Sequence, residues 1–180
     1  MKSLNQTIEI PEGIDITTEG LLMKIKGPNG EVERIINLKG IEIKKEENII
    51  KIDTKKTSRN YKKIINTTRA HIINMIKGVQ EAYVYKLKVC SGHFPMTVTI
   101  ENKEVIVKNF LGEKKPRKAK VIDGVEIKID KDEITIESPD IEKAGQTAAN
   151  IETSTRITKK DRRVFMDGIW ITQKANKEIK

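Results

Sequence analysis

The chain has 180 residues, of which 37% are hydrophobic, 4% aromatic and 34% charged, and its formal net charge is +9 at pH 7. This length suits one domain or two small ones, each with a modest core. The single cysteine, Cys90, excludes an internal disulfide, the first residues lack the apolar segment of a signal peptide, and no apolar run approaches the roughly 18–20 residues that span a bilayer, so we expect a soluble, cytoplasmic protein.

The first part of the chain alternates apolar and polar residues, which is typical of half-buried β-strands. Two short strands are predicted within residues 1–20, and two more over 21–26 and 31–38. The turn between the last two is Gly- and Pro-rich. We expect a hairpin over 41–52 to complete one antiparallel sheet with these strands.

Residues 57–79 predict the longest helix, because apolar side chains recur there at helical spacing and would pack on one face of the sheet. Gly78 is expected to cap its C-terminus. The opposite face is polar and basic. The main role of this helix is therefore expected to be structural, and an RNA contact along the polar face would be an addition to that role.

A second series of strands is predicted over 83–90, 96–100 and 105–107, again from alternation. A basic loop with Gly and Pro follows over 108–120. Its Lys and Arg side chains are suited to lie along a phosphate backbone. Phe110 in this loop is expected to plug the edge of the domain rather than to stack on a base.

The stretch from Gly124 to Ile151 predicts a hairpin followed by a helix. Two alternating strands are separated by a short polar turn over 125–137. The helix is expected to begin at Ser138-Pro139-Asp140, with Ser138 as the N-cap. Its apolar residues recur at steps of three and four up to Ile151, so one face would be buried.

The same order of hairpin and helix occurs earlier in the chain. Residues 40–44 match residues 124–128 at an offset of 84, and the second strands of the two hairpins match at an offset near 85. An internal duplication explains this better than a chance likeness. We therefore predict an α+β fold with two tandem duplicated domains, 1–80 and 81–180, each an antiparallel β-sheet with one α-helix packed on it.

The end of the chain is basic again over 156–163. The segment 164–172, with Trp170, is expected to dock on the second domain, and residues 174–180 are expected to form a frayed tail.

The positive charge is concentrated in three stretches. Residues 54–77 carry +7, residues 108–120 carry +5 and residues 153–180 carry +5, so the remainder of the chain carries −8. This segregation is typical of a protein that binds a polyanion. The alternative is that the basic residues only make the surface soluble. This is the weaker interpretation, because three separate basic runs occur beside an acidic remainder.

The sequence contains no recognisable catalytic motif. Glycine-rich phosphate-binding motifs, a nucleophile elbow and HExxH are all absent. Cys90 and His93 are close in sequence, but no third residue orients them. Asp130, Asp132 and Glu133 are better explained as a polar hairpin turn than as a cation site. We therefore expect no enzyme activity, no cofactor and no metal.

Three motifs resemble one protein family. Residues 140–151 (DIEKAGQTAANI) are similar to the D-x-x-x-hydrophobic-G-Q-x-A-A-x-I helix of the universal large-subunit ribosomal protein six, the L-six family. Residues 109–117 (NFLGEKKPR) resemble the basic loop of its archaeal and eukaryotic branch. Residues 162–170 (RRVFMDGIW) resemble the same branch, where bacterial members carry a Pro-Tyr-Lys-Gly ending. The resemblance covers nearly the whole chain and implies two duplicated α+β domains.

The resemblance implies a structural role in the large ribosomal subunit, near the region where translation factors dock. The implied partners are 23S-type rRNA, neighbouring ribosomal proteins and nearby translation factors, with no membrane and no small-molecule substrate. Contacts with rRNA would come mainly from the second domain and the tail. Carried onto this sequence, they are Lys108, Lys114, Lys115, Arg117, Lys118, Gln146, Asn150, Arg156, Lys159, Lys160, Arg162 and Arg163.

The sequence differs from the family pattern in two respects, and two other functions are compatible with it. The archaeal-type ending prevents the transfer of bacterial contact positions, and the basic first helix favours more RNA contact by the first domain than the family pattern implies. A free-standing RNA-binding or RNA-chaperone protein would share the same distribution of charge. The first domain is also open to interpretation as a protein-interaction module, since residues 1–22 carry little positive charge.

Overall fold

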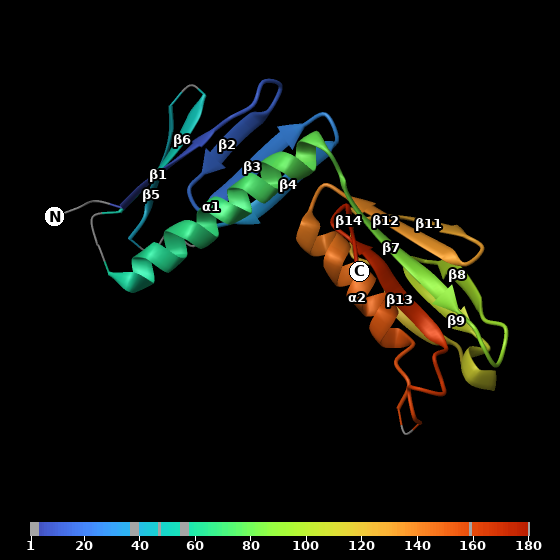
Figure 1. Ribbon diagram of the computed structural model, residues 1–180. Helices are drawn as coiled ribbons and strands as arrows, with labels where there is room; N and C mark the ends of the chain where they lie inside the picture. Colours follow the sequence, from blue (N-terminus) through green and yellow to red (C-terminus); the bar gives the residue numbers. More distant parts are fainter. Residues whose placement is uncertain (1–3, 37–39, 47, 55–57, 159, 180) are drawn as a thin grey trace. The chain divides into compact units, whose positions relative to one another are not determined.

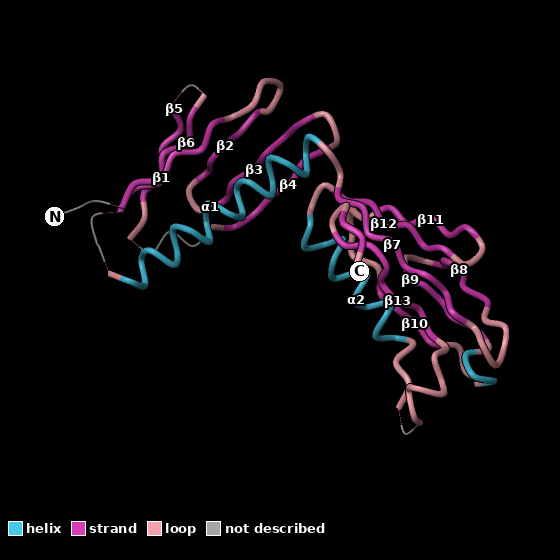
Figure 2. Tube along the Cα trace, in the orientation of Figure 1, coloured by secondary structure: helices cyan, strands magenta, loops and turns pink. Residues whose placement is uncertain are grey.

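The computed structural model describes residues 4–36, 40–46, 48–54, 58–158 and 160–179. The chain forms two compact units, Met1–Ala82 and Tyr83–Lys180, and each has its own hydrophobic core. Figures 1 and 2 show one long helix and several antiparallel strands in each unit. None of the helices in the described ranges is long and apolar enough to cross a membrane.

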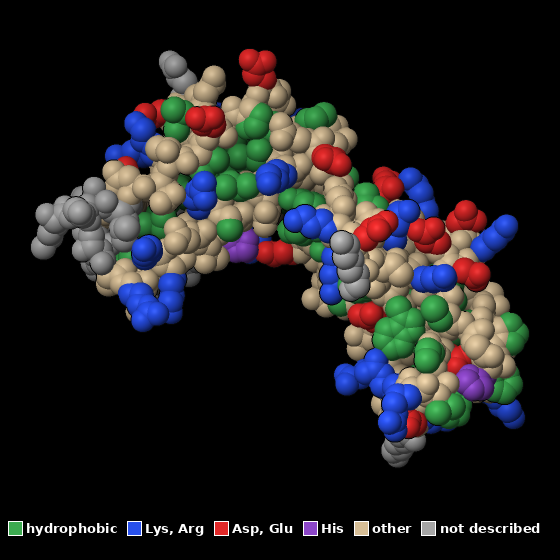
Figure 3. Space-filling view, viewed as in Figure 1, with side chains coloured by type: hydrophobic (Ala, Val, Ile, Leu, Met, Phe, Trp, Pro, Cys, Tyr) green, Lys and Arg blue, Asp and Glu red, His purple; other side chains and the backbone are tan. Residues whose placement is uncertain are grey.

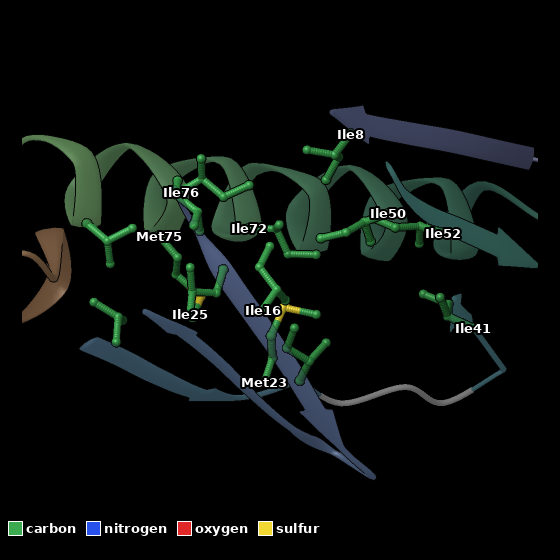
Figure 4. Packing of buried hydrophobic residues seen from close by; sticks show 14 of the residues in the cluster. Ile8, Ile16, Met23, Ile25, Ile41, Ile50, Ile52, Ile72, Met75 and Ile76 are labelled. Carbon is green, nitrogen blue, oxygen red and sulfur yellow. The ribbon is translucent and has the colours of Figure 1, made fainter. Parts of the chain in front are cut away.

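Unit 1 combines two small sheets with one helix. Its elements are β1 (Leu4–Glu9), β2 (Asp15–Glu19), β3 (Leu22–Gly27), β4 (Gly30–Ile35), β5 (Glu42–Glu46), β6 (Ile49–Thr54) and α1 (Arg59–Gln80). The strands form the antiparallel sheets β1-β6-β5 and β2-β3-β4, and α1 contacts strands of both. Figure 4 shows isoleucines from both sheets, together with Met23 of β3, packed against Ile72, Met75 and Ile76 of the helix in one core.

The hairpin β5–β6 was predicted to complete one sheet with the earlier strands, but it does not pair with β2, β3 or β4. It pairs with β1 instead, and Ile8 lies opposite Ile50 in that pairing. Both isoleucines are buried in the core between the sheets and α1. The burial of each such side chain stabilises the fold by about 1.5–3 kcal/mol, so this pairing is favoured over one that exposes them.

Helix α1 continues past the predicted cap. Gly78 is a buried residue within the helix, which ends at Gln80. Asn29 in the β3–β4 turn satisfies the last carbonyl groups: its backbone N–H donates to Val79 O at 3.0 Å, and its Nδ2 donates to Gln80 O at 2.5 Å. Because a neighbouring turn supplies these hydrogen bonds, no left-handed glycine is needed to end the helix.

Unit 2 repeats this plan with additional elements. They are β7 (Tyr83–Cys90), β8 (Thr97–Glu101), β9 (Glu104–Lys108), the 3₁₀ helix η1 (Phe110–Gly112), β10 (Arg117–Lys120), β11 (Glu126–Asp130), β12 (Glu133–Ser138), α2 (Ile141–Ser154), β13 (Gly168–Lys174) and β14 (Lys177–Glu178). The strands form the sheets β10-β9-β8 and β11-β12-β7-β13-β14. Helix α2 contacts strands of both.

Three predictions for unit 2 are wrong in detail. The end of the basic loop is a strand, β10, which pairs with β9. The predicted frayed tail contains β14, which pairs with β13. Just before it, Asn176 N–H donates to Val84 O at 3.1 Å and Val84 N–H donates to Asn176 Oδ1 at 2.7 Å. The N-cap of α2 is Asp140, whose Oδ1 accepts the Glu142 N–H at 2.9 Å, and Ser138 instead ends β12.

The two units repeat one arrangement of strands and hydrogen bonds. The sheets β1-β6-β5 and β2-β3-β4 correspond to β7-β12-β11 and β8-β9-β10. Thr54 Oγ1 donates to Gly40 O at 2.8 Å, and Ser138 Oγ donates to Gly124 O at 2.9 Å, which is the same bond 84 positions later. The second strands also match at 84 rather than 85. The α+β class with one helix per unit is confirmed, and each unit contains two sheets.

Candidate nucleic-acid interface

Three connecting segments meet at one end of unit 2. They are the β7–β8 loop (91–96), the β9–β10 connection (109–116) and the α2–β13 segment (155–167). Asn109 Nδ2 donates to Pro95 O at 3.0 Å and so joins the first segment to the second. Two further residues, Arg117 and Asp167, connect the third segment to the others and fix the shape of this end.

Arg117 binds the β9–β10 connection to the end of α2. Its Nη1 donates to the carbonyl oxygens of Ser154 at 3.0 Å and Arg156 at 3.1 Å. Its Nε and Nη2 donate to the Glu113 carboxylate at 2.8 and 2.6 Å, and this hydrogen bonding lowers the pKa of Glu113. The guanidinium lies 4.2 Å from the centre of the Phe110 ring, which is buried as a plug, as predicted.

Asp167 holds the β7–β8 loop against the α2–β13 segment. Its Oδ1 accepts the backbone N–H groups of Gly92 at 2.7 Å and His93 at 2.8 Å, and its Oδ2 lies 2.6 Å from His93 Nδ1. Burial alone would raise the pKa of Asp167, but the hydrogen bonds from His93 and Gly92 outweigh it and lower the pKa. The His93 ring stacks on Phe165 with 4.7 Å between centroids.

Five exposed cations surround this scaffold, and we call them the cationic tip. They are Lys114, Lys115, Arg156, Lys160 and Arg162. Within the described ranges, none of them has a carboxylate oxygen within 4.0 Å. Lys160 Nζ lies 4.5 Å from the centre of the Phe165 ring, and the Arg162 guanidinium lies 5.2 Å from that of Trp170. Figure 3 shows Lys and Arg side chains beside hydrophobic ones at this end of unit 2.

A shallow pocket of about 300 Å³ adjoins the cationic tip. Arg156 and Arg162 line it together with Ile169 and Trp170. Glu152 also lines the pocket, where its Oε1 accepts the Ile171 N–H at 3.3 Å. The pocket therefore combines two cations and one acid with an apolar and aromatic wall, and its net positive charge suits a negatively charged ligand that carries a flat ring.

Other residues predicted to contact RNA have partners within the protein. Three form exposed ion pairs: Lys108 with Glu101 at 3.7 Å, Lys118 with Glu104 at 3.0 Å, and Arg163 with Asp161 at 2.9 Å. Hydrogen bonding by Arg163 lowers the pKa of Asp161. Exposed pairs of this kind contribute little to stability, so a phosphate can replace the carboxylate at small cost.

The two polar residues predicted on α2 lie apart from the cationic tip. Gln146 Nε2 donates to Asn150 Oδ1 at 2.9 Å, and Asn150 Nδ2 donates to Lys120 O at 3.1 Å. This chain of bonds joins α2 to the end of β10. Lys159, which was also predicted to contact RNA, lies outside the described residues.

Comparisons with known proteins identify a family. A family model described as "Ribosomal protein L6" matches residues 10–82 and 94–168. The protein named "Large ribosomal subunit protein uL6" of Sulfurisphaera tokodaii is 46% identical over 172 residues, which cover 95% of this chain and 92% of the relative. The protein of the same name from Nanoarchaeum equitans is 47% identical over 180 residues, covering 96% and 94%. That of Aeropyrum pernix is 40% identical over 170 residues, covering 94% and 93%.

Proposed function

Because the chain belongs to the ribosomal protein L6 family, as the matches in both units show, we propose that it is a structural protein of the large ribosomal subunit. It would then work bound to ribosomes in the cytoplasm, with rRNA and other ribosomal proteins as partners. The family predicted from the three sequence motifs is confirmed. It is a family of structural proteins, so the prediction that the chain is not an enzyme is confirmed as well.

The ligand of the cationic tip is the large-subunit rRNA. The observation that carries this proposal is a set of five exposed cations without described carboxylate partners, held on a scaffold fixed by Arg117 and Asp167. Lys and Arg that neutralise phosphates release counterions, and this release drives binding. Contacts of this kind position a protein on RNA without reading its sequence.

The pocket beside the cationic tip accommodates an unpaired base. Single-stranded loops and bulges expose bases that stack on aromatic rings or on Arg guanidinium planes. Trp170 and Arg162 offer both surfaces at this pocket. A base seated there would place its own phosphates near Arg156 and Arg162.

The remaining predicted residues form the margin of this interface. Lys108, Lys118 and Arg163 would exchange their carboxylates for phosphates, and Lys159 would add a further cation. Gln146 and Asn150 would extend the interface along α2. The location in the subunit that the family resemblance implies is the region near the translation-factor docking site.

The test compares two triple variants in the full chain. Lys114→Gln, Lys115→Gln and Arg162→Gln remove three charges from the cationic tip. Lys86→Gln, Lys103→Gln and Lys128→Gln remove three charges from acid-paired lysines elsewhere in unit 2. Binding to a large-subunit rRNA transcript is measured at several salt concentrations.

We expect only the first variant to bind weakly. The slope of log K against log[salt] should become shallower by about 0.7–0.9 for each phosphate contact removed. The control variant should keep the slope of the unaltered protein. An equal loss in both variants would mean that net charge alone drives binding, and the cationic tip would then not be a defined site.

The alternative function, a free-standing RNA-binding or RNA-chaperone protein, predicts a different distribution in cells. Lysate is fractionated on sucrose gradients at low and at high salt, and the chain is followed by immunoblot. Co-migration with the large subunit at high salt supports the proposed function. Absence from ribosomal fractions at both salt concentrations would favour the alternative.

A further inference from the structure

The outer face of α1 is a stripe of positive charge in unit 1. Five basic residues lie on it, and the helix contains no acidic residue; they are Arg59, Lys62, Lys63, Arg69 and Lys77. All five are exposed. In the part of the chain that the structure describes, none of them forms an ion pair with a carboxylate.

The geometry of an α-helix places these residues on one side. At about 100° per residue, all five fall within a sector of about 120°. The buried residues Thr68, Met75 and Val79 lie on the opposite side of the helix. At 1.5 Å per residue, the stripe from Arg59 to Lys77 is about 27 Å long. It therefore forms a linear array of charge, which is densest from Arg59 to Arg69 and is followed after about 12 Å by Lys77.

The stability of the helix does not explain this stripe. Arg59 lies three and four positions before Lys62 and Lys63, and like charges at these spacings destabilise a helix. All three lie near the helix N-terminus, where the positive end of the dipole disfavours cations. In the corresponding helix α2, by contrast, Asp140 caps the N-terminus and Glu142 lies in the first turn. A bound polyanion would make the arrangement in α1 favourable.

We propose that this stripe of α1 is a second RNA-binding surface, which contacts the phosphate backbone of the rRNA independently of the cationic tip. RNA fits the stripe better than an acidic protein segment does, because the one large apolar residue in this sector, Ile73, is half-buried and packs on the core. Protein interfaces need exposed apolar side chains for their cores, whereas a duplex offers closely spaced phosphates along its length. Asn66, exposed between the cations, adds a neutral hydrogen-bond donor.

This inference rests on the proposed function only in taking rRNA as the ligand. It differs in location, since the proposed function assigns RNA binding to unit 2. The two are tested in the same assay with separate variants. If the α1 variant binds weakly while the cationic-tip variant binds normally, the proposed site in unit 2 fails and the inference stands.

The test uses two charge-matched triple variants of the full chain. Lys62→Gln, Lys63→Gln and Arg69→Gln neutralise the stripe. Lys24→Gln, Lys44→Gln and Lys51→Gln neutralise lysines of the same unit that pair with Glu33, Glu42 and Glu46. Affinity for a large-subunit rRNA transcript is measured between low and moderate salt, and thermal melting is recorded for each variant.

We expect the α1 variant to lose RNA affinity, with a salt slope shallower by about 2, since each lost phosphate contact removes about 0.7–0.9. Its melting temperature should stay the same or rise, because like-charge repulsion within the helix is relieved. The control should match the unaltered protein in both measurements. Unchanged affinity and slope in the α1 variant would overturn the inference.

A photo-crosslinking residue at position 66 identifies the partner directly. In assembled large subunits, crosslinks from this position to rRNA support the inference. Crosslinks to protein alone would overturn it and would assign the stripe to an acidic protein segment. The same crosslinker at Lys44, on β5 of unit 1, serves as the control and should give no RNA crosslink.

Discussion

A single close approach determines how α2 packs in unit 2. A Cβ atom at Gly145 would lie 3.0 Å from the Tyr85 hydroxyl oxygen and 3.4 Å from Cζ of the same ring. These distances are shorter than the ordinary contacts of about 3.5–4.0 Å. Helix α2 therefore lies at its observed distance from β7 because position 145 has no side chain.

Gly145→Val should destabilise the protein by about 1–3 kcal/mol, the usual cost of overpacking. In an unconstrained helix interior, replacing Gly by Ala would instead stabilise by about 0.5–1 kcal/mol. Urea unfolding measures the difference. As a control, Gly145→Ala is compared in the unaltered and the Tyr85→Phe backgrounds, since Tyr85→Phe removes the atom nearest to the added Cβ and should lower its cost. An unchanged free energy of unfolding for Gly145→Val would refute this account.

Asp167→Asn should destabilise the protein by about 1.5–3 kcal/mol near neutral pH, as expected for hydrogen bonds to a buried charged group. The folded state lowers the pKa of Asp167. The contribution is therefore complete above the unfolded value, near 3.9, and is lost as the pH falls through the folded pKa. The unfolding free energies of both proteins should differ by a constant amount from pH 7 to about pH 5, and the difference should then shrink steadily as the pH falls towards 3. Asp161→Asn, at an exposed ion pair, should have little effect, and a difference that does not shrink between pH 5 and pH 3 would contradict the prediction.

At the scale of elements, the sequence predicted local structure well and pairing poorly. The alternation of apolar and polar residues located β3, β7 and β12, because a strand with one buried face shows this pattern in its own sequence. The partner of a strand depends on residues far away, so the sequence did not show that β6 pairs with β1. The strand β13 was predicted only as a docked segment, since its place beside β7 is set by tertiary contacts.

At the interface, too, features encoded locally were predicted and features that depend on residues distant in sequence were missed. The cationic tip was predicted because clustered charge is visible in the sequence. The roles of Arg117 and Asp167 were missed, since each acts through residues tens of positions away. The only local signal for Asp167 is an acid in an otherwise basic and apolar segment. Charge alone therefore did not separate cations that hold the loops from cations that remain exposed.

Exposed cations and cations that hold the loops together should respond differently to substitution, even where they are neighbours in the sequence. Lys114→Gln with Lys115→Gln should weaken rRNA binding and leave the melting curve unchanged, because both side chains are exposed without described ion pairs. Arg117→Gln should lower the melting temperature, since it removes the bonds to Glu113, Ser154 and Arg156. Thermal melting monitored by circular dichroism distinguishes the two. Equal melting temperatures for both variants would show that Arg117 does not hold the connection to α2.

At the scale of the whole molecule, the duplicated fold carries two differently charged helices. The Gly40–Thr54 and Gly124–Ser138 hydrogen bonds show how closely the hairpins correspond. The surfaces nevertheless differ: unit 1 has its cations along the helix, whereas unit 2 has them on the connections at one end. A duplicated fold thus offers two basic surfaces of different shape, one linear and one clustered around aromatic rings.

If both surfaces contact one rRNA at the same time, their contributions to the salt dependence of binding should add. The cationic-tip variant and the α1 variant are combined in one chain, and the slope of log K against log[salt] is compared with those of the two triple variants. Because the substituted residues belong to separate units and share no partners in the described structure, the slope changes should sum within error. A combined variant with no shallower slope than either parent would mean that the two surfaces bind alternative sites rather than one RNA. Addition would instead establish that each unit contributes its own phosphate contacts to a single complex.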